Sequence, residues 1–321
     1  MICIVVTRGY RYTHRRVCRN LGRSKIRILT YDRLISSKRL PPATYVFSDI
    51  DRLSLWDREL AAIYYRALAE GGFPVLNDPA QVKTRFALLR SLHEAGINDF
   101  NVYRAGEATA TVRFPVFLRR ESGHGYPLSG LIESADDLAR AIEGAVADGV
   151  PVDAILVIEY CAEPVEPDLF RKLAIFRIGQ AMVPHVCVHD DNWLVKYGKM
   201  GIATPALYDD ELRIIRENPF AEELKRAFDI AQIDYGRADF GIVGGRVQIY
   251  EINTNPHLTP GDSHPSAQRM ESQRLFWDKY IDAVQALAGK SLATRAVRIS
   301  DERLKRKQGL RGRLIRSRRA P

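Results

Sequence analysis

Four polar residues on two neighbouring predicted strands have the types and the spacing of a metal site. Arg237 and Asp239 are two positions apart in RADF, and Glu251 and Asn253 are two positions apart in YEIN. Side chains at positions i and i+2 of a strand point to the same face, so each pair shares a face. Two carboxylates and an amide oxygen suit Mg²⁺, with waters and substrate phosphates completing its octahedron. Arg237 beside them could hold a phosphate or the anion being transferred.

The register of the hairpin decides whether these two pairs meet. A two-residue loop at Gly244–Gly245 would place Asp239 opposite Tyr250 and split the polar residues between the two faces. A three-residue loop over 243–245, with a left-handed glycine in a bulge, would instead pair Asp239 with Glu251. We predict this odd register, because it gathers all four side chains on one surface. A polar sheet face with ordinary ion pairs is the alternative interpretation of the same spacing.

Short strands alternate with helices in the first part of the chain. Apolar, β-branched runs at 3–6, 26–31, 44–49 and 73–78 predict strands, and 54–72 predicts a helix that begins at a serine and ends at glycine. This alternation favours a small open α/β lobe over residues 1–76.

The rest of the chain mixes helices with antiparallel strands. Asp78 followed by proline predicts the start of a helix over 78–97. The β-rich runs 170–179 and 180–189 predict one hairpin that turns at Gly179–Gln180. Further helices are expected at about 134–148, 209–217, 219–231 and 265–288.

Composition narrows the class of protein. The chain of 321 residues is 46% hydrophobic and 27% charged, which is typical of a soluble globular protein with two or three lobes. No apolar run approaches the roughly 20 residues that a membrane helix needs, and the N-terminus resembles a first strand more than a signal peptide. The four cysteines are scattered without metal-ligand spacing, which predicts free thiols and a cytoplasmic protein.

The net charge of +9 is concentrated at the C-terminal end. Residues 290–321 hold twelve Lys or Arg and two acidic residues, which leaves 36 basic and 37 acidic residues in the rest of the chain. The body is therefore close to neutral, and we expect 290–321 to be a basic, solvated or disordered tail.

The motif RADF…YEINTNP resembles the C-terminal signature of the ATP-grasp superfamily, which has R-x-D on one strand and E-x-N-x-x-P on the next. The resemblance implies that Asp239, Glu251 and Asn253 hold Mg²⁺, two ions in all, with Mn²⁺ as a substitute, bridging the phosphates of ATP. It also implies that Arg237 is catalytic and contacts the reacting phosphoryl group. The implied fold is an α/β lobe (1–76) followed by an ATP-grasp domain (77–289) whose two α+β subdomains clamp ATP.

Segments upstream resemble other parts of the same family in the same order. Lys83 stands where a helix lysine of the family reaches a nucleotide phosphate. FPVFLRRESGHG resembles the family's strand and glycine loop, which implies that Arg119 is a catalytic, phosphate-binding residue and that Gly123 and Gly125 let backbone N–H groups approach the phosphates. The family usually has lysine at the position of Arg119; arginine keeps the charge but is planar and bulkier.

ILVIEYCAEP resembles the hinge between the two subdomains, near 159–168. The resemblance implies that Glu159, Tyr160 and Cys161 border the adenine, and that Glu166 or Asp168 holds the ribose hydroxyls. Farther along, candidates to face phosphate or substrate are Arg171, Lys172, Trp193 and Lys196.

The segments YGRADFG and EINTNPHL resemble the sequences of the glutathione-synthetase-like and ribosomal-protein-glutamylating branch of this superfamily. This likeness implies an ATP-dependent ligase that forms a C–N bond between a small-molecule or peptide carboxylate and an amine, through an acylphosphate. The cations of 7–16 and the loop 256–266, with His257, Ser263 and His264, are candidates to meet the substrates. A homodimer is one candidate for the assembly of this protein.

Two other functions compete with ligation. Some ATP-grasp members are phosphotransferases, so transfer of phosphate to a hydroxyl is the first alternative. The second is a non-catalytic protein that binds nucleotides or, through the basic tail, nucleic acid. The tail lacks interleaved aromatic residues, which argues against a nucleic-acid partner.

Overall fold

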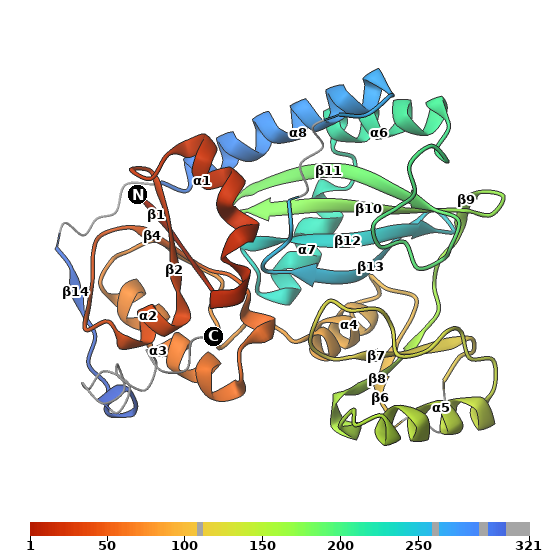
Figure 1. The fold of residues 1–321 in the computed structure, drawn as a ribbon, viewed down its shortest axis with the longest axis horizontal. Helices are drawn as coiled ribbons and strands as arrows, with labels where there is room; N and C mark the ends of the chain where they lie inside the picture. The colour runs from red at the N-terminus through yellow and green to blue at the C-terminus, as the bar shows by residue number, and fades with distance from the viewer. Residues whose placement is uncertain (108–111, 259–262, 289–294, 306–321) are drawn as a thin grey trace.

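The structure is a computed structural model that describes residues 1–107, 112–258, 263–288 and 295–305. It consists of three lobes (Figure 1), which are the N-terminal lobe, a small central lobe and a larger lobe built on an antiparallel sheet. The predicted α/β class is confirmed. Of the residues described, no helix has both the length and the apolar composition needed to cross a bilayer.

The N-terminal lobe is a parallel sheet in the order β2-β1-β4-β5. Its strands are β1 (Ile2–Val6), β2 (Ile26–Thr30), β4 (Thr44–Phe47) and β5 (Val75–Leu76). Its helices are η1 (Arg8–His14, a 3₁₀ helix), α1 (Arg15–Leu21), α2 (Tyr31–Ser36), η2 (Ile50–Arg52, 3₁₀) and α3 (Leu55–Glu70). All of β1 is buried, as expected of a central parallel strand.

The central lobe is a three-stranded antiparallel sheet in the order β6-β8-β7. Its elements are α4 (Arg85–Glu94), β6 (Val102–Arg104), β7 (Val116–Arg120), α5 (Ala135–Ala147), η3 (Val152–Ala154, 3₁₀) and β8 (Ile155–Glu159). The chain then crosses to the third lobe between Glu159 and Pro164.

The third lobe is an antiparallel sheet in the order β11-β10-β12-β13, with β9 beside β10. Its elements are β9 (Pro164–Glu166), β10 (Leu169–Ile178), β11 (Ala181–Asp190), α6 (Pro205–Glu217), α7 (Ala221–Ala231), β12 (Tyr235–Val243), β13 (Arg246–Asn253) and α8 (Ala267–Ala286). The predicted hairpin turn at Gly179–Gln180 is confirmed, because Ile178 pairs with Ala181.

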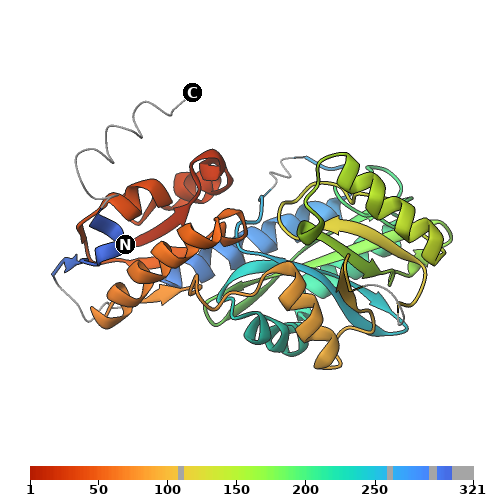
Figure 2. The same cartoon turned by 90° about the horizontal axis from the view of Figure 1, so that it is seen from below.

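Helix α8 joins the N-terminal and third lobes. It runs from α6 and the β10–β11 sheet to the N-terminal lobe, as both views show (Figures 1 and 2). Phe276, Tyr280 and Val284 of α8 lie in one hydrophobic cluster with Ile4 of β1 and Phe176 of β10. The two lobes therefore share a core, which fixes their relative position.

Helix α4 begins later than its sequence predicts. Asp78 and Pro79 form a turn instead, in which the Ala80 N–H donates to the Asp78 carboxylate at 2.9 Å. The carbonyl of Pro79 accepts from Arg58, so it is not free to start a helix. The helix begins at Arg85 because the Thr84 side chain caps it.

The C-terminal segment also differs from the expected solvated tail. Strand β14 (Val297–Arg298) pairs with β3 (Arg39–Leu40) of the N-terminal lobe, and η4 (Glu302–Leu304, 3₁₀) follows it. Ile299 and Leu304 are buried in the core of that lobe. Residues 295–305 therefore belong to the N-terminal lobe, because their apolar side chains complete its core; residues 289–294 and 306–321 of the predicted tail lie outside the described residues.

Candidate active site

The β12–β13 hairpin brings the predicted polar residues to one face, by a different route from the one predicted. The turn has two residues, Gly244 and Gly245, both with positive φ, so Val243 pairs with Arg246. The register then shifts between Asp239 and Phe240.

This shift is a β-bulge that contains the extra residue Tyr250. Phe240 pairs with Ile249, whereas Asp239 pairs with Glu251 and Arg237 pairs with Asn253. The bulge, and not the turn, therefore supplies the odd register. It gathers the four polar residues on one face, as the sequence predicted.

The carboxylate of Asp239 is deeply buried and lies between two cations. Its side chain is 2% exposed, and Arg237 forms a two-pronged ion pair with it, at 2.6 Å from Nε and 2.9 Å from Nη2. The ammonium of Lys172 lies 3.5 Å from the same carboxylate. The polar face is therefore an enclosed site, and not a solvated sheet surface with ordinary ion pairs.

Glu251 is held by two arginines from the central lobe. Its Oε2 accepts from Arg85 at 3.0 Å and from Arg119 at 3.1 Å, and its Oε1 accepts from Asn253 at 2.9 Å. Burial alone would raise the pKa of Glu251, but the two guanidinium groups, with smaller contributions from His124 and Asn253, hold it well below its usual range. The carboxylate is therefore ionised at every physiological pH and can bind a cation.

A cleft between the central and third lobes ends at these carboxylates. Its inner part is apolar and aromatic, and Phe117, Tyr160 and Trp193 lie together there, with Trp193 5.0 Å from Phe117 and 5.6 Å from Tyr160 between ring centroids. The backbone of Cys161 and the Tyr250 ring border the same part, and the Tyr250 hydroxyl donates to the Cys161 carbonyl at 3.1 Å.

The other end of the cleft is charged. The ionic residues that line the cleft are Arg119, Arg171, Lys172, Lys196, Asp239, Glu251 and, in the hinge segment, Glu163. A ligand with an aromatic ring at one end and several negative charges at the other matches this division, because the ring replaces water on apolar surface and the charges meet cations.

Arg85 connects the glycine loop to the hairpin. Its guanidinium donates to the carbonyls of Arg120, Glu121 and Gly123, and to the Glu251 carboxylate. Gly123 has a φ of +91°, in the left-handed region that favours glycine. Gly125 lines the cleft. The loop therefore bends over the charged end of the cleft.

The oxygen donors fit a hard divalent cation. Asp239 and Glu251 are directly opposed, and Asn253 is hydrogen-bonded to Glu251. Within the described ranges no three acidic, histidine or cysteine side chains converge as a metal cluster. A cation here would thus have two carboxylates and an amide and would need ligand oxygens to complete its shell, which suits Mg²⁺ bound together with phosphates.

Four of the residues expected at the nucleotide lie elsewhere, and one of them is Asp168, which does not line the cleft. The side chain of Glu159 turns away from the cleft and accepts from the backbone N–H groups of Asn101 and Arg113. Glu166 accepts from Thr204, the N-cap of α6, and is not among the residues lining the cleft. Lys83 precedes α4 because the helix begins late, and it borders a second cleft, beside the N-terminal lobe.

The other expected residues meet at or beside the cleft. The residues that line it are Arg119, Gly125, Tyr160, Cys161, Arg171, Lys172, Trp193, Lys196, Asp239 and Glu251. Asn253 borders the second cleft, which shares Glu251 with the first. The two clefts therefore meet at the predicted metal site.

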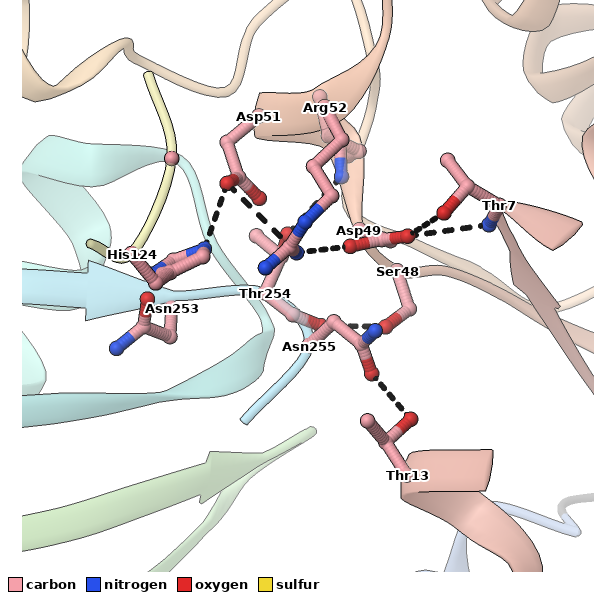
Figure 3. Close-up of polar contacts among 12 residues, drawn as sticks. Thr7, Thr13, Ser48, Asp49, Asp51, Arg52, His124, Asn253, Thr254 and Asn255 are labelled. Atoms are coloured by element: carbon pink, nitrogen blue, oxygen red, sulfur yellow. Dashed lines mark hydrogen bonds and ion pairs between the residues drawn. The ribbon is translucent and has the colours of Figure 1, made fainter. Parts of the chain in front are cut away.

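The N-terminal lobe is clamped to the end of β13 by polar contacts (Figure 3). Ser48 donates to the Thr254 carbonyl at 2.6 Å, and Thr13 donates to the Asn255 side chain at 2.8 Å. The Thr254 hydroxyl in turn accepts from the Ile50 N–H at 3.1 Å. The strand end that carries Asn253 is thus positioned by the first lobe.

His124 of the glycine loop also contacts the N-terminal lobe. Its Nε2 lies 2.8 Å from the Asp51 carboxylate (Figure 3). Burial would raise the pKa of Asp51, but the contact with His124 and the charges of His124 and Arg52 lower it overall. The contact therefore joins the loop to the first lobe as a latch.

We expect Asp51→Asn to release this latch without unfolding the protein. The two side chains are 28% and 33% exposed, and surface ion pairs contribute about 1 kcal/mol or less, so the free energy of unfolding should change little. Amide hydrogen exchange in residues 121–125 should become faster, because the loop loses its contact. Asp136→Asn on the exposed side of α5 is the control, and equal exchange in both variants would contradict the latch.

Sequence reasoning missed three residues of the site. Arg85 was missed because the helix was predicted to begin at Asp78, which made Lys83 and not Arg85 the expected cation of this helix. Tyr250 was hidden because nothing in the sequence marks the bulge. Phe117 could have been found, since it alternates with Val116 and Leu118 on a strand whose other face is buried.

No protein-family model matches the sequence, and no curated protein matches it significantly. Solved structures do resemble the fold. A RimK domain protein ATP-grasp from Sphaerobacter thermophilus is 16% identical with a TM-score of 0.52, covering 90% of this chain and 99% of that one. A D-alanine–D-alanine ligase from Bacillus anthracis is 14% identical with a TM-score of 0.50, covering 88% of this chain and 97% of that one.

Proposed function

We propose that this chain, which has the ATP-grasp fold, is an ATP-dependent ligase that joins a carboxylate to an amine. The observation that carries the proposal is the cleft that runs from the aromatic group around Trp193 to the opposed carboxylates Asp239 and Glu251. One end suits a base and the other suits a metal-bound triphosphate. The solved structures of similar fold include a D-alanine–D-alanine ligase, which supports ligation as the reaction class.

The base of ATP would lie against Tyr160 and Trp193, near the backbone of Cys161 at the hinge. Arg119 and Lys172 would bind the phosphates at the charged end. Burial lowers the pKa of Arg119, although its neighbour Glu251 opposes this effect, and an arginine so placed remains charged. The fixed cations would stabilise charge on the phosphoryl group without reorganising.

Asp239, Glu251 and Asn253 would hold Mg²⁺, with two ions as in our sequence interpretation and Mn²⁺ as a substitute. Bound Mg²⁺ would neutralise charge on the phosphates of ATP. Arg237, paired with Asp239, would contact the reacting phosphoryl group from the same face. Burial alone would lower the pKa of Arg237, but the charge of Asp239, the hydrogen bond to it and the charge of Glu251 together raise it.

The second cleft would hold the substrates. It lies beside the N-terminal lobe and is lined by Arg58, Lys83 and Arg85, with Glu251 and Asn253 at the junction with the first cleft. A carboxylate there would attack the γ-phosphorus, the bond to the β–γ bridging oxygen would break, and ADP would leave. An amine would then attack the acyl carbon of the acylphosphate, lose a proton and expel phosphate, which gives the amide.

The test is an assay of all products. Purified protein is incubated with ATP, Mg²⁺ and a panel of amino acids and peptides, and ADP, phosphate and amide are measured together. We expect ADP and phosphate in equal amounts, with an amide of matching quantity. A phosphorylated product without free phosphate would instead indicate a phosphotransferase, and nucleotide binding without turnover on any pair would indicate a non-catalytic binder.

The compartment and the assembly remain predictions. We propose a cytoplasmic protein, since all four cysteines are free and Cys3 and Cys187 are buried. We propose small-molecule or peptide substrates and no nucleic-acid partner. A homodimer is a further prediction, which light scattering of the purified protein would check.

A further inference from the structure

An open groove on the N-terminal lobe is lined by arginines and by no carboxylate. The arginines are Arg8, Arg11, Arg15, Arg19, Arg23 and Arg27. We call this surface the arginine groove. All six side chains are exposed, and no carboxylate of the described residues forms an ion pair with any of them. Elsewhere on the surface, arginines such as Arg213 and Arg274 do pair with nearby acids.

Successive elements bring these arginines to one groove. Arg8 and Arg11 lie on η1, Arg15 and Arg19 lie on α1, and Arg27 lies on β2, which is an edge strand of its sheet. Like charges so close repel one another. Because no carboxylate of the described residues pairs with them, the groove favours an anionic ligand.

One end of the arginine groove lies beside residues that contact the candidate active site. Tyr12, which also lines the groove, has its ring centroid 5.7 Å from that of His257. The His257 carbonyl accepts from Arg237 at 3.4 Å. Thr13, the next residue, donates to Asn255 two positions after the metal ligand Asn253. The end of the groove at Tyr12 therefore lies close to Arg237, although the groove shares no lining residue with either cleft.

We propose that the arginine groove binds an acidic segment of a polypeptide substrate, at a distance from the carboxylate that reacts. Guanidinium groups fit carboxylates in a two-pronged geometry, and a row of them fits a row of acidic side chains. The inference rests on the proposed function for the reaction itself, because a ligase must receive a carboxylate. Single-stranded RNA carries the same charge but brings no carboxylate to the site, so we favour the polypeptide.

The test measures binding without catalysis. Fluorescence anisotropy is recorded for a labelled oligoglutamate peptide, an oligoglutamine peptide of equal length, and an RNA of equal charge, in the absence of ATP. The protein variants are R11Q/R15Q/R19Q in the groove and R140Q/R216Q/R226Q as the control, which removes three exposed arginines from α5, α6 and α7. Both variants lose the same charge, and melting curves confirm that both fold.

We expect oligoglutamate to bind the parent protein, and the groove variant to bind it about tenfold more weakly, since exposed ion pairs are individually small but three are removed. The control variant should bind within about twofold of the parent, because distant exposed charges are screened at physiological salt. Absence of oligoglutamate binding, equal weakening by both variants, or RNA binding as tight as that of the peptide would each overturn the proposal.

A failure here is distinguishable from a failure of the proposed function. Asp239→Asn abolishes the metal site but leaves the groove, so it should bind oligoglutamate like the parent. Oligoglutamate binding by a parent protein that shows no ligase activity on any substrate pair would support the groove and refute the reaction. Ligase activity on small carboxylates without oligoglutamate binding would support the reaction and refute the groove as a peptide site.

Discussion

Asp239→Asn is expected to lower kcat/KM of the ligation by about a thousandfold, because a metal clamp supplies several kcal/mol of transition-state stabilisation. Asparagine keeps the size of the side chain and one oxygen, so the hydrogen bond from Arg237 can persist. It removes the charge that would attract the cation to the opposed pair Asp239 and Glu251. The measurement is the initial rate of ADP release over a range of Mg²⁺ concentrations.

A matched control is available in the same lobe. Asp229 pairs with the buried Arg177, as Asp239 pairs with Arg237, but it lies on α7, outside both clefts. Asp229→Asn should therefore retain nearly full activity. Retention of more than about a tenth of the parent rate by Asp239→Asn would contradict its role as a metal ligand, since a tenfold loss corresponds to only about 1.4 kcal/mol.

Asn77→Ala is expected to destabilise the protein by about 4 kcal/mol, because it leaves several buried backbone groups without partners. Asn77 is 0% exposed and lies just after β5. Its side-chain nitrogen donates to the carbonyls of Phe47 and Tyr235, and its oxygen accepts from the N–H groups of Asp234 and Tyr235. One amide thus joins the end of β4 to the start of β12.

Asn77 also has a positive φ, at 62°. Alanine is strained in this conformation by roughly 1 kcal/mol, whereas glycine is not. Comparison of Asn77→Ala with Asn77→Gly therefore separates the backbone strain from the lost hydrogen bonds. Urea denaturation gives the free energy of unfolding for each.

Asn218→Ala is the control for this experiment. Asn218 also has a positive φ, but among the residues that the structure describes its side chain donates only to the Met182 carbonyl. The Asn218→Ala substitution should lower the free energy of unfolding by about 1 to 2 kcal/mol, because it adds the backbone strain and removes one hydrogen bond. A similar loss in both variants would show that Asn77 does not join the two lobes as the structure indicates.

Much of the fold could be predicted from the sequence, because periodicity and capping residues act locally. Ser54, Ser134 and Thr204 cap the helices predicted near them, and β-branched runs form the strands. The incorrect predictions concern features that depend on contacts between segments far apart in the sequence. The start of α4 depends on Arg58, which binds the carbonyls of a turn some twenty residues away, and the position of 295–305 depends on gaps in a core formed by the N-terminal lobe.

In the candidate site, too, the features set by local sequence were predicted and those set by distant contacts were not. The i, i+2 spacing correctly placed Arg237 with Asp239 and Glu251 with Asn253, since alternation along a strand is a property of the backbone. The odd register that joins the two pairs was also predicted, but it comes from the bulge and not from the predicted three-residue turn. The orientation of Glu159 could not be foreseen, because it depends on backbone N–H groups of Asn101 and Arg113 that only the folded chain brings together.

The bulge at Tyr250 has a consequence for how this hairpin can change in length. Its extra residue turns a ring toward the hinge carbonyl of Cys161 and also sets which side of β13 carries Glu251. Gly241 on the neighbouring strand pairs with Gln248, and a Cβ there would lie 2.3 Å from the Tyr250 hydroxyl, so a side chain at 241 would require the Tyr250 ring to move. Loss of this extra residue would give a regular ladder in which Asp239 still pairs with Glu251, but it would remove the Tyr250 ring from the lining of the cleft. The bulge therefore serves the aromatic end of the cleft, and a shortened hairpin would keep the opposed acids while losing that wall.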